Sequence, residues 1–462
     1  MRTVVLGTGP AGCAAALTLA RRGHDVTLID RDEPPAFGTV SADQIFATWD
    51  RPTIGQFRQP HNFLGRGRAI LRDAFPNVYD SLLARGAGEI RQDSFLGVAA
   101  REPGDADLAT IACRRPVIDA ALWSAVGGQR GVSFRSAGVS GLRMTTSQVT
   151  GVRLGSGEVV AADLVVDAMG RNSPAGRWLA ECGAPTWPER RSDCRLLYYS
   201  RHFRFRGESP RYASVLGGPR GDLGYLAFAV FIGDGATFCV CVMSPAGQTE
   251  WRDLRDPAAF DRVARALPGL ADWLDVAEPL TSVLPMGQLR NTLRDTVDHD
   301  TPVVTGLIPI GDARCHTNPT FALGLSLSLT HATSLAAACD LASDDTDLVL
   351  GFEHQIGAEA TACFDAVSAE DRDRARLWSG DPIDPTDRVD TMPLFLRSVV
   401  YRVATHDPAL LRAVCRRIDL LDPIDALASN QELLDRAEQL FRQLPRTQPP
   451  HRADLLAALR GR

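Results

Sequence analysis

Two kinds of apolar pattern alternate over the first thirty residues. Residues 3–6 and 25–29 are short, mostly apolar runs, as in strands of a parallel sheet that is covered on both faces. Between them, residues 10–22 are apolar or small almost to their end, which predicts a buried helix. The chain therefore opens with the strand, helix and strand that begin a parallel α/β sheet.

A long loop and further elements follow. Proline and glycine punctuate residues 33–65, and loops of this length usually carry function. The spacing of apolar residues predicts a helix over 64–85 that breaks at Pro76, and a second helix over 116–126. Short strands are expected at 132–134, 149–154 and 164–167, with a hairpin turn at 155–157.

The pattern changes near residue 194. Closely spaced apolar runs predict the strands of an antiparallel sheet at 195–205, 212–216, 223–232 and 237–243. Helical patterns within 257–274, strands at 281–285 and 302–310, a long apolar helix at 321–339 and a helical remainder follow. We expect a nucleotide-binding domain in two parts, 1–190 and 280–345, an antiparallel-sheet substrate domain, 191–279, and a helical C-terminal region, 346–462.

A glycine-rich turn joins the first strand to the first helix. It consists of Gly7, Thr8, Gly9, Pro10, Ala11 and Gly12, and Asp30 ends the next strand. The glycines permit a tight turn and a close approach of the backbone to a pyrophosphate, towards which the helix directs its free N–H groups. A carboxylate at the position of Asp30 binds a ribose diol in such sites. The complete context predicts a dinucleotide site.

Two later strand ends carry glycine and acidic residues. One runs into Asp167-Ala-Met-Gly170, and the other into Gly311-Asp312, which precedes Asn318-Pro319 and the long apolar helix. Aspartate accepts hydrogen bonds from a ribitol chain, and the positive N-terminus of a helix stabilises the negative charge of a reduced flavin. Three such turns so far apart predict one extended flavin cofactor that threads the domain.

All 50 basic residues are arginine, because the chain contains no lysine. Mechanisms that need a lysine amine are therefore excluded. A net charge of −6 without any basic run argues against a nucleic-acid partner. Ten cysteines without a C-x-x-C pair indicate a reduced, cytoplasmic protein without a metal site. We also expect no signal peptide and no membrane span.

With these motifs the sequence resembles the class A flavoprotein monooxygenases of the para-hydroxybenzoate hydroxylase fold, over about residues 1–340. The Asp-x-x-Gly spacing of Asp167 and Gly170 is similar to the branch that contains polyether epoxidases, flavin-dependent halogenases and geranylgeranyl reductases. The spacing of four residues also resembles a segment of the epoxidase-like members, namely Arg51, Gln56, Arg58 and His61. The resemblance implies an α/β fold with a Rossmann-like FAD-binding domain of the glutathione-reductase type, an antiparallel β-sheet substrate domain and a helical C-terminal region.

The resemblance also implies roles for residues. Asp30 would bind the adenosine ribose, Asp312 the ribitol, and Arg115 with Asp119 would lie near a non-covalent FAD. The residues expected to bind the cofactor are Gly7, Gly9, Pro10, Ala11, Gly12, Asp30, Arg31, Arg58, Arg115, Asp167, Gly170, Gly311, Asp312, Pro319 and Gly324. The family usually has Gly-x-Gly after the proline, whereas Ala322 here would bring a methyl group towards the flavin ring or the oxygen pocket.

The activity that the resemblance implies is an FAD-dependent monooxygenase. NADPH or NADH reduces the flavin, oxygen forms a C4a-hydroperoxide, and one oxygen atom passes to an apolar or aromatic secondary metabolite, as in antibiotic biosynthesis. A dehydrogenase or reductase of a carbon–carbon bond is the alternative, and a flavin-fold binding protein without catalysis is a third. A halogenase is excluded, because that branch requires a lysine and a Trp-x-Trp-x-Ile-Pro motif, and the chain has neither.

The catalytic residues stay open, with His61 and Arg201 as candidates. His202 and His316 are further candidates for proton relay, although a lone histidine is more often structural. Residues that alternate onto one strand face would contact substrate or form an ordinary core, namely Tyr199, Arg201, Phe203, Phe205, Leu226, Phe228 and Val230. Expected partners are a small-molecule substrate and a flavin reductase or a carrier-bound substrate, for a monomer or a homodimer.

Overall fold

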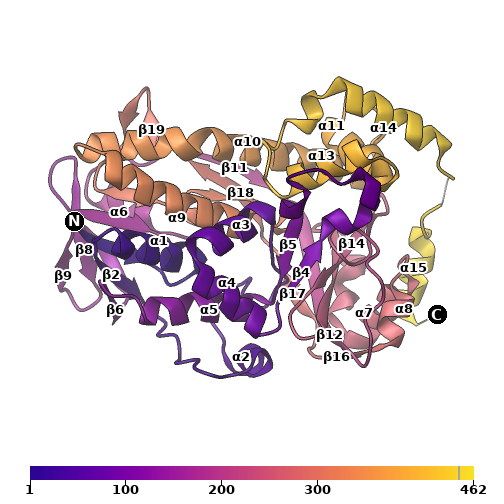
Figure 1. Ribbon diagram of the computed structural model, residues 1–462, viewed down its shortest axis with the longest axis horizontal. Coiled ribbons are helices and arrows are strands. Elements are labelled where there is room, and N and C mark those ends of the chain that lie inside the picture. Colours follow the sequence, from indigo (N-terminus) through magenta and orange to yellow (C-terminus); the bar gives the residue numbers. More distant parts are fainter. Residues whose placement is uncertain (446–447, 462) are drawn as a thin grey trace.

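The computed structural model describes residues 1–445 and 448–461. Figure 1 shows a part built on a parallel sheet beside the N-terminus and a part built on an antiparallel sheet on the side of the C-terminus. Within the described residues, no helix combines the length and the apolar composition that a membrane span needs.

Five parallel strands form the first sheet, in the order β21-β10-β1-β2-β6. Their bounds are Arg2–Leu6 for β1, Asp25–Asp30 for β2, Val132–Ser136 for β6, Leu164–Asp167 for β10 and Leu307–Pro309 for β21. Leu6 pairs with Asp167 on one side and with Ile29 on the other. The carboxyl ends of three strands from distant parts of the chain therefore meet at one edge of the sheet.

Both faces of this sheet are covered. On one face lie α1 (Pro10–Arg21), α5 (Arg115–Gly127), α9 (Leu323–Leu341) and the start of α10 (Asp345–Ser379), which share an apolar cluster with the sheet. On the other lie β7 (Val139–Met144), β8 (Val149–Leu154), β9 (Val159–Ala161) and α6 (Ala175–Glu181). Burial on both faces explains why the strands are mostly apolar.

The second large sheet is antiparallel, in the order β13-β14-β15-β12-β16, and β17 also pairs with β12. The bounds are Leu196–Phe205 for β12, Arg220–Asp222 for β13, Ala227–Ile232 for β14, Thr237–Pro245 for β15, Ala277–Pro279 for β16 and Leu284–Met286 for β17. One face packs against α7 (Pro257–Ala266), α8 (Ala271–Asp275) and α15 (Arg452–Arg460). The other face packs against the end of α10 through Leu377 and Trp378.

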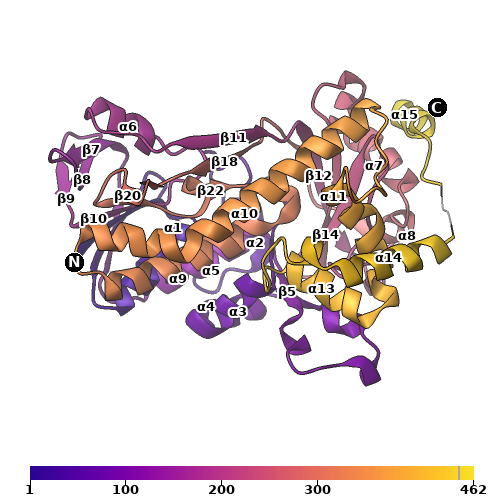
Figure 2. The ribbon, with the colours of Figure 1, turned by 90° about the horizontal axis from the view of Figure 1, so that it is seen from above.

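α10 joins the two parts. Figure 2 shows this helix running from the parallel-sheet part across to the antiparallel-sheet part. It ends at Gly380, which has the left-handed backbone (φ 86°) that favours glycine at the end of a helix. A cluster of helices then packs beside it, made of α11 (Met392–Phe395), a π-helical turn at Leu396–Val400, α12 (Tyr401–Val403), α13 (Pro408–Ile418) and α14 (Gln431–Gln443).

Smaller elements connect these layers. The long loop after β2 contains α2 (Ala42–Thr48) and leads to α3 (Gly65–Ala74), and α4 (Pro76–Ala84) begins at the predicted break. The other short strands are β3 (Asn62–Phe63), β4 (Gly88–Arg91), β5 (Ala109–Ala112), β11 (Glu189–Asp193), β18 (Arg290–Arg294), β19 (Val297–Asp298), β20 (Thr301–Pro302) and β22 (Cys315–His316).

Two predicted strands are wrong. Residues 212–216 form no strand and contribute only an isolated bridge between Ser214 and Gly217. The strand expected at 302–310 is two short strands, β20 and β21, separated by a turn in which Gly306 has φ 74°. A Cβ atom on Gly306 would lie 2.1 Å from the carbonyl oxygen of Val149, so the close approach of these two segments requires glycine.

Candidate functional site

A cavity of about 430 Å³ lies at the carboxyl ends of the parallel strands. All three predicted turns contribute to its wall, and its far end reaches Met286 and Leu289 at the antiparallel sheet. Of the residues predicted to bind a cofactor, those that line it are Gly7, Gly9, Pro10, Ala11, Asp30, Arg31, Arg115, Gly170, Asp312, Pro319 and Gly324. One continuous site thus joins segments that are more than 300 residues apart in the sequence.

Close packing of backbone holds the start of α1 between the other two turns. A Cβ atom on Gly7 (φ 101°) would lie 2.7 Å from the carbonyl oxygen of Ala168, and one on Gly12 would lie 1.9 Å from the carbonyl oxygen of Gly7. A Cβ atom on Gly311 would lie 2.8 Å from the Cβ of Ala11. Gly12 and Gly311 do not line the cavity, so their role in this geometry is to let the three turns meet.

The N-terminus of α1 is an open anion site. Its N-cap residue, Gly9, offers no side chain to the free N–H groups, and the first turn contains no acidic residue. A Cβ atom on Gly9 would have Arg115 Nη2 as its nearest neighbour, at 3.9 Å. Backbone N–H groups, the helix dipole and a guanidinium therefore face the same space, which suits a pyrophosphate.

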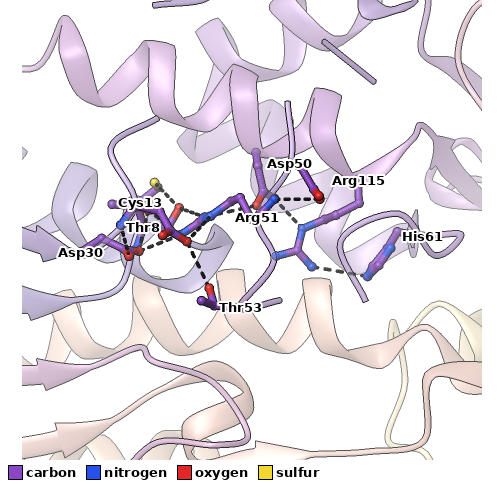
Figure 3. Close-up of polar contacts among 10 residues, drawn as sticks. Thr8, Cys13, Asp30, Asp50, Arg51, Thr53, His61 and Arg115 are labelled. Carbon is purple, nitrogen blue, oxygen red and sulfur yellow. Dashed lines mark hydrogen bonds and ion pairs between the residues drawn. The ribbon is translucent and has the colours of Figure 1, made fainter. Parts of the chain in front are cut away.

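Asp30 lies beside this helix end and is held by Thr8 and Arg51. Its Oδ2 accepts hydrogen bonds from the backbone N–H and hydroxyl of Thr8, both at 2.7 Å, and from Arg51 Nη2 at 2.7 Å (Figure 3). Burial alone would raise the pKa of this carboxyl, but Arg51 and the Thr8 donors outweigh burial and lower it. The carboxylate is therefore ionised and fixed at the position expected for a ribose contact.

A buried chain of charges runs from Asp30 towards the other end of the cavity. Arg51 Nη1 lies 3.7 Å from Asp119 Oδ2, and Asp119 Oδ1 accepts a hydrogen bond from Arg115 Nε. Arg115 Nη1 in turn lies 3.3 Å from His61 Nε2 (Figure 3). The prediction singled out Arg115 and Asp119 but assigned no role to Arg51, whose pairing with Asp30 depends on a loop that local sequence does not position.

His61 is a neutral hydrogen-bond acceptor in this chain. Its Nδ1 lies 2.8 Å from the carbonyl oxygen of Gln59, so Nδ1 carries the proton and Nε2 accepts from Arg115. Burial, with the charge of Arg115, lowers the pKa of His61 to about 3. His61 lines the cavity, as expected for a candidate catalytic residue, but it does not exchange a proton near neutral pH.

Two histidines hold the Gly311-Asp312 turn. His331 Nδ1, on α9, accepts the N–H of Gly311 at 3.0 Å, and burial lowers the pKa of His331 to about 3. His316 Nδ1 lies 3.1 Å from Asp312 Oδ2. Burial acts to raise the pKa of Asp312, but His316 and then Arg115 and Arg171 lower it. Sequence reasoning missed His331, because nothing marks one histidine in a long apolar helix as the partner of a turn twenty residues earlier.

Asp167 shapes its turn and does not line the cavity. Its Oδ1 accepts the N–H of Met169 at 3.0 Å and its Oδ2 accepts the hydroxyl of Ser173 at 2.5 Å. Burial raises the pKa of Asp167, although these two hydrogen-bond donors act to lower it. The turn then presents Gly170, at φ 77°, to the cavity.

The start of α9 forms the end of the cavity nearest the antiparallel sheet. Ala322 is its N-cap residue and has a left-handed backbone (φ 55°, ψ 20°), a conformation that favours glycine. Asn318 Nδ2 donates to Asp371 Oδ1 of α10 at 2.6 Å, and Asn318 also accepts a hydrogen bond from the Tyr198 hydroxyl of β12. The helix end is therefore fixed to both large parts of the fold.

Three candidates lie elsewhere. Arg58 does not line the cavity and donates to the carbonyl oxygens of Phe46 at 2.7 Å and Trp49 at 3.1 Å, so it organises the loop. Arg201 is paired with Asp261 of α7 at 2.6 Å, on the face of the sheet that turns away from the cavity. His202 is buried against the Arg58 carbonyl oxygen at 2.8 Å, and burial lowers its pKa to about 4.

The residues considered for substrate contact lie on the face of the antiparallel sheet that packs against helices. The six other residues chosen for it form the core with α7, α8 and α15, as the alternative interpretation held: Tyr199, Phe203, Phe205, Leu226, Phe228 and Val230. Residues one position along each strand form the opposite face, including Tyr198, Ala227, Ala229, Cys241 and Met243, and they share an apolar cluster with Met286 and Leu289, which line the cavity. Both faces are buried, so the alternation of side chains does not distinguish them.

Comparisons with known proteins found a family model and a related sequence. Residues 2–108 match the family model described as DAO, FAD dependent oxidoreductase. The chain is 27% identical over 363 residues to protein Rv3254 of Mycobacterium tuberculosis, and the alignment covers 72% of each chain.

Solved structures share the fold. The chondrochloren halogenase CndH, from a myxobacterium, has a TM-score of 0.59 at 16% identity, with 98% of each chain covered. PqsL of Pseudomonas aeruginosa, described as a probable FAD-dependent monooxygenase, has a TM-score of 0.59 at 15% identity, covering 82% of this chain and 99% of that one. OxyS anhydrotetracycline hydroxylase of Streptomyces rimosus has a TM-score of 0.57 at 18% identity, covering 91% and 76% respectively.

Proposed function

We propose that this chain, which carries an FAD-dependent oxidoreductase domain within residues 2–108 and shares its fold with flavin monooxygenases and halogenases, is an FAD-dependent monooxygenase of a small organic molecule. One observation carries the proposal. A single cavity joins the anion site at the start of α1 to the start of α9 and to the apolar face of the antiparallel sheet. Such a cavity holds an extended dinucleotide at one end and an organic substrate at the other.

The residues present fit FAD. The open N-terminus of α1 and Arg115 would hold the pyrophosphate, Asp30 the adenosine ribose, and Asp312 the ribitol. The ionised states of Asp30 and Asp312 suit acceptors of hydroxyl hydrogen bonds. The positive end of α9 would lie by the flavin ring, where it favours negative charge.

When bound, FAD would supply the electron transfer and the activation of oxygen. The chain would orient the substrate against the apolar sheet face and exclude water there. The histidines His61 and His331 stay neutral and serve as fixed hydrogen-bond partners, because burial lowers the pKa of each to about 3. Substrate positioning is therefore the main contribution that we assign to the protein side chains.

An FAD-dependent dehydrogenase or reductase of a carbon–carbon bond is the second candidate. Ala322 favours it, because a left-handed alanine carries a methyl group at the helix end that faces the cavity. A halogenase is disfavoured despite the shared fold, since the chain contains no lysine. We also propose that NADPH or NADH is the reductant and that the protein is a cytoplasmic enzyme of secondary metabolism. The domain division that we propose remains an FAD-binding domain in two parts, 1–190 and 280–345, a substrate domain, 191–279, and a helical region, 346–462.

The test compares how the reduced protein reacts with oxygen and with substrates. The FAD-loaded protein is reduced anaerobically and mixed with isotopically labelled oxygen and a panel of apolar aromatic compounds. A monooxygenase transfers one labelled atom to product. Reoxidation that returns the labelled oxygen fully as hydrogen peroxide, with no label in any organic compound, would favour the reductase and would lead us to repeat the reaction with Ala322→Gly. Protein that binds no FAD would overturn both candidates.

A further inference from the structure

Residues 50–56, here called the flap, lie between two aromatic anchors. Trp49 and Phe57 precede and follow the flap, are 7% and 1% exposed, and pack edge to face with ring centroids 5.0 Å apart. Both belong to one apolar cluster with Ala120 of α5. The two ends of the flap are therefore held side by side on the core, as in a compact surface loop whose ends are close.

Between these anchors the chain forms turns, and none of residues 50–56 belongs to a helix or a strand. Its backbone hydrogen bonds are local. The N–H of Ile54 donates to the carbonyl oxygen of Arg51, and the N–H of Phe57 donates to the carbonyl oxygen of Ile54, both at 2.9 Å. The flap can therefore move as a unit without breaking a helix or a sheet.

The flap forms one wall of the cavity and reaches across it. Near the end of β2, the Thr53 hydroxyl donates to Asp32 Oδ2 at 3.1 Å. On the opposite wall, a Cβ atom on Gly55 would lie 3.9 Å from Nη2 of Arg171, which follows β10. Five of the seven flap residues line the cavity, namely Arg51, Thr53, Ile54, Gly55 and Gln56.

Arg51 ties the flap to the core. Its guanidinium is 3% exposed and donates to Asp30 Oδ2 at 2.7 Å and to the Thr8 hydroxyl at 2.9 Å (Figure 3), and its Nη1 lies 3.7 Å from Asp119 Oδ2. Separation of a buried ion pair is costly, whereas the exposed hydrogen bond of Thr53 contributes little. Arg51 is therefore the main contact that keeps the flap closed.

The flap and the expected ribose site share the carboxylate of Asp30. Arg51 and Thr8 bind its Oδ2, whereas its Oδ1 accepts the N–H of Asp32 at 3.1 Å. A carboxylate oxygen can accept two hydrogen bonds, so Oδ1 can also accept one from a ribose hydroxyl. A bound dinucleotide would therefore contact Asp30 without displacing Arg51 from it.

We propose that the flap opens to admit FAD and then closes over it, with Arg51 as its latch. Opening separates Arg51 from Asp30 and Asp119, while Trp49 and Phe57 stay packed on the core as the two hinges. Closure restores the ion pairs and holds the cofactor in the cavity. This inference rests on the proposed binding of FAD and is independent of oxygen transfer.

The test measures how fast FAD binds and leaves. Stopped-flow flavin fluorescence gives the association rate constant of the FAD-free protein, and trapping of released FAD gives the dissociation rate constant. If only the open flap admits FAD, the association rate constant is proportional to the open population. Arg51→Gln should therefore raise both rate constants at least about tenfold, with a smaller change in Kd.

Arg115→Gln is the matched comparison. Arg115 also pairs with Asp119 and lines the cavity, but it lies on α5, outside the flap. This variant should raise the dissociation rate constant without raising the association rate constant. Thr53→Val removes only the exposed tie and leaves every buried charge paired. It should raise both rate constants about two- to fivefold.

An association rate constant that Arg51→Gln leaves unchanged or lowers would overturn the flap, and would make Arg51 a static part of the ribose site. If Arg51→Gln does not fold, Thr53→Val decides by the same criterion. Protein that binds no FAD would overturn both the flap and the proposed function. Accelerated exchange in a protein that fails to transfer oxygen would retain the flap and overturn only the monooxygenase proposal.

Discussion

At the scale of single residues, burial and neighbouring charges together decide which groups around the cavity are charged. His61 and His331 are neutral because burial lowers the pKa of each to about 3. Asp30 and Asp312 stay ionised although burial opposes ionisation, since Arg51 and His316 respectively stabilise the carboxylates. Fixed neutral acceptors and fixed negative ones therefore lie side by side in and behind the cavity wall.

Gly9 and Gly12, two of the three glycines of the first turn, should respond differently to substitution. Gly12→Val should fail to give folded protein, because even a Cβ atom would lie 1.9 Å from a backbone oxygen. Gly9→Val should fold, since the nearest atom to a Cβ there is 3.9 Å away, and should lose at least about tenfold in FAD affinity by filling the pyrophosphate site. Circular dichroism and flavin absorbance of the purified proteins measure both effects.

Asp312→Ala extends this test to the third turn. It should also give folded protein with little bound flavin, because it removes a carboxylate that lines the cavity. Full FAD occupancy in Gly9→Val or Asp312→Ala would contradict our assignment of these turns to the cofactor.

Asp419 should make stability depend on pH. Burial raises the pKa of this carboxyl to about 8, although the Gly65 N–H, Gln92 and Arg68 act to lower it. The folded protein therefore holds a proton that the unfolded chain releases near pH 4, so the free energy of unfolding falls between about pH 4 and 8, by up to about 1.4 kcal/mol per pH unit. Asp419→Asn should remove this slope in urea titrations at several pH values.

The matched control for this change is Asp193→Asn, at an exposed carboxyl whose side chain is 70% accessible. It should leave the pH dependence as it is. An equal slope in the Asp419→Asn variant and the unaltered protein would show that Asp419 is ionised when folded.

The positions of residues were predictable from the sequence where the backbone dictates them. The close packing at Gly7 and Gly12 follows from the steric demands of a tight turn, and the places of Asp30 and Asp312 in the cavity wall follow from their positions at strand ends. The role of an arginine depends on which carboxylate or carbonyl the tertiary fold brings to it. Local sequence therefore did not reveal that Arg58 holds a loop or that Arg51 holds Asp30.

At the scale of elements, α10 is joined to the start of α9 by buried hydrogen bonds. Asp371 accepts from Asn291 Nδ2 at 2.9 Å and from Asn318 Nδ2 at 2.6 Å, and it is paired with Arg374. All four side chains are buried. The helix that joins the two parts of the fold is thus bonded directly to Asn318, the N-cap residue of the short helical turn Pro319–Phe321 that leads into α9.

Removal of the Asp371 carboxylate should destabilise the contact between α10 and the start of α9. Asp371→Ala leaves Arg374 buried and unpaired, which we expect to lower the free energy of unfolding by about 3–5 kcal/mol and to weaken FAD binding through Asn318. Urea unfolding and flavin titration measure these effects. Asp365→Ala, at an exposed position on the same helix, should change both by little; similar losses in the two variants would contradict this role.

The order and type of most elements were predictable, and the packing partner of each sheet face was not. The apolar runs of β12, β14 and β15 identified the strands, but both faces are buried, so the pattern could not tell which face packs against α7, α8 and α15. β11 and β18 were missed because Glu189–Asp193 and Arg290–Arg294 are largely polar strands, without an apolar alternation to detect.

At the scale of the whole molecule, the last described helix completes a core that begins 250 residues earlier. Leu455 and Leu459 of α15 pack with Trp251 and Phe260 under the antiparallel sheet. Hydrogen bonds from Arg262 to the carbonyl oxygens of Ala458 and Leu459, both at 2.8 Å, hold the helix end. The sequence predicts helices in this region but not where they pack, because an amphipathic pattern does not identify the surface against which a helix lies.

Leu455→Ala should therefore destabilise the antiparallel-sheet part. Loss of a fully buried leucine typically lowers the free energy of unfolding by about 2–5 kcal/mol. Tryptophan fluorescence during urea unfolding reports on this core directly, because Trp251 and Trp273 belong to it. Leu341→Ala, at a position that is 82% exposed, is the control and should have almost no effect. Equal stability of both variants would show that α15 is dispensable.

The position of α15 also sets the order of events while the chain is being made. A ribosome releases residues 196–286 long before residues 452–460, so the strands of the antiparallel sheet emerge with one flank of their core still uncovered. The parallel sheet likewise stays incomplete until β21 emerges, about 300 residues after β1. Both cores of this protein therefore close only once these later elements have been synthesised, and until then the nascent chain carries exposed apolar strands.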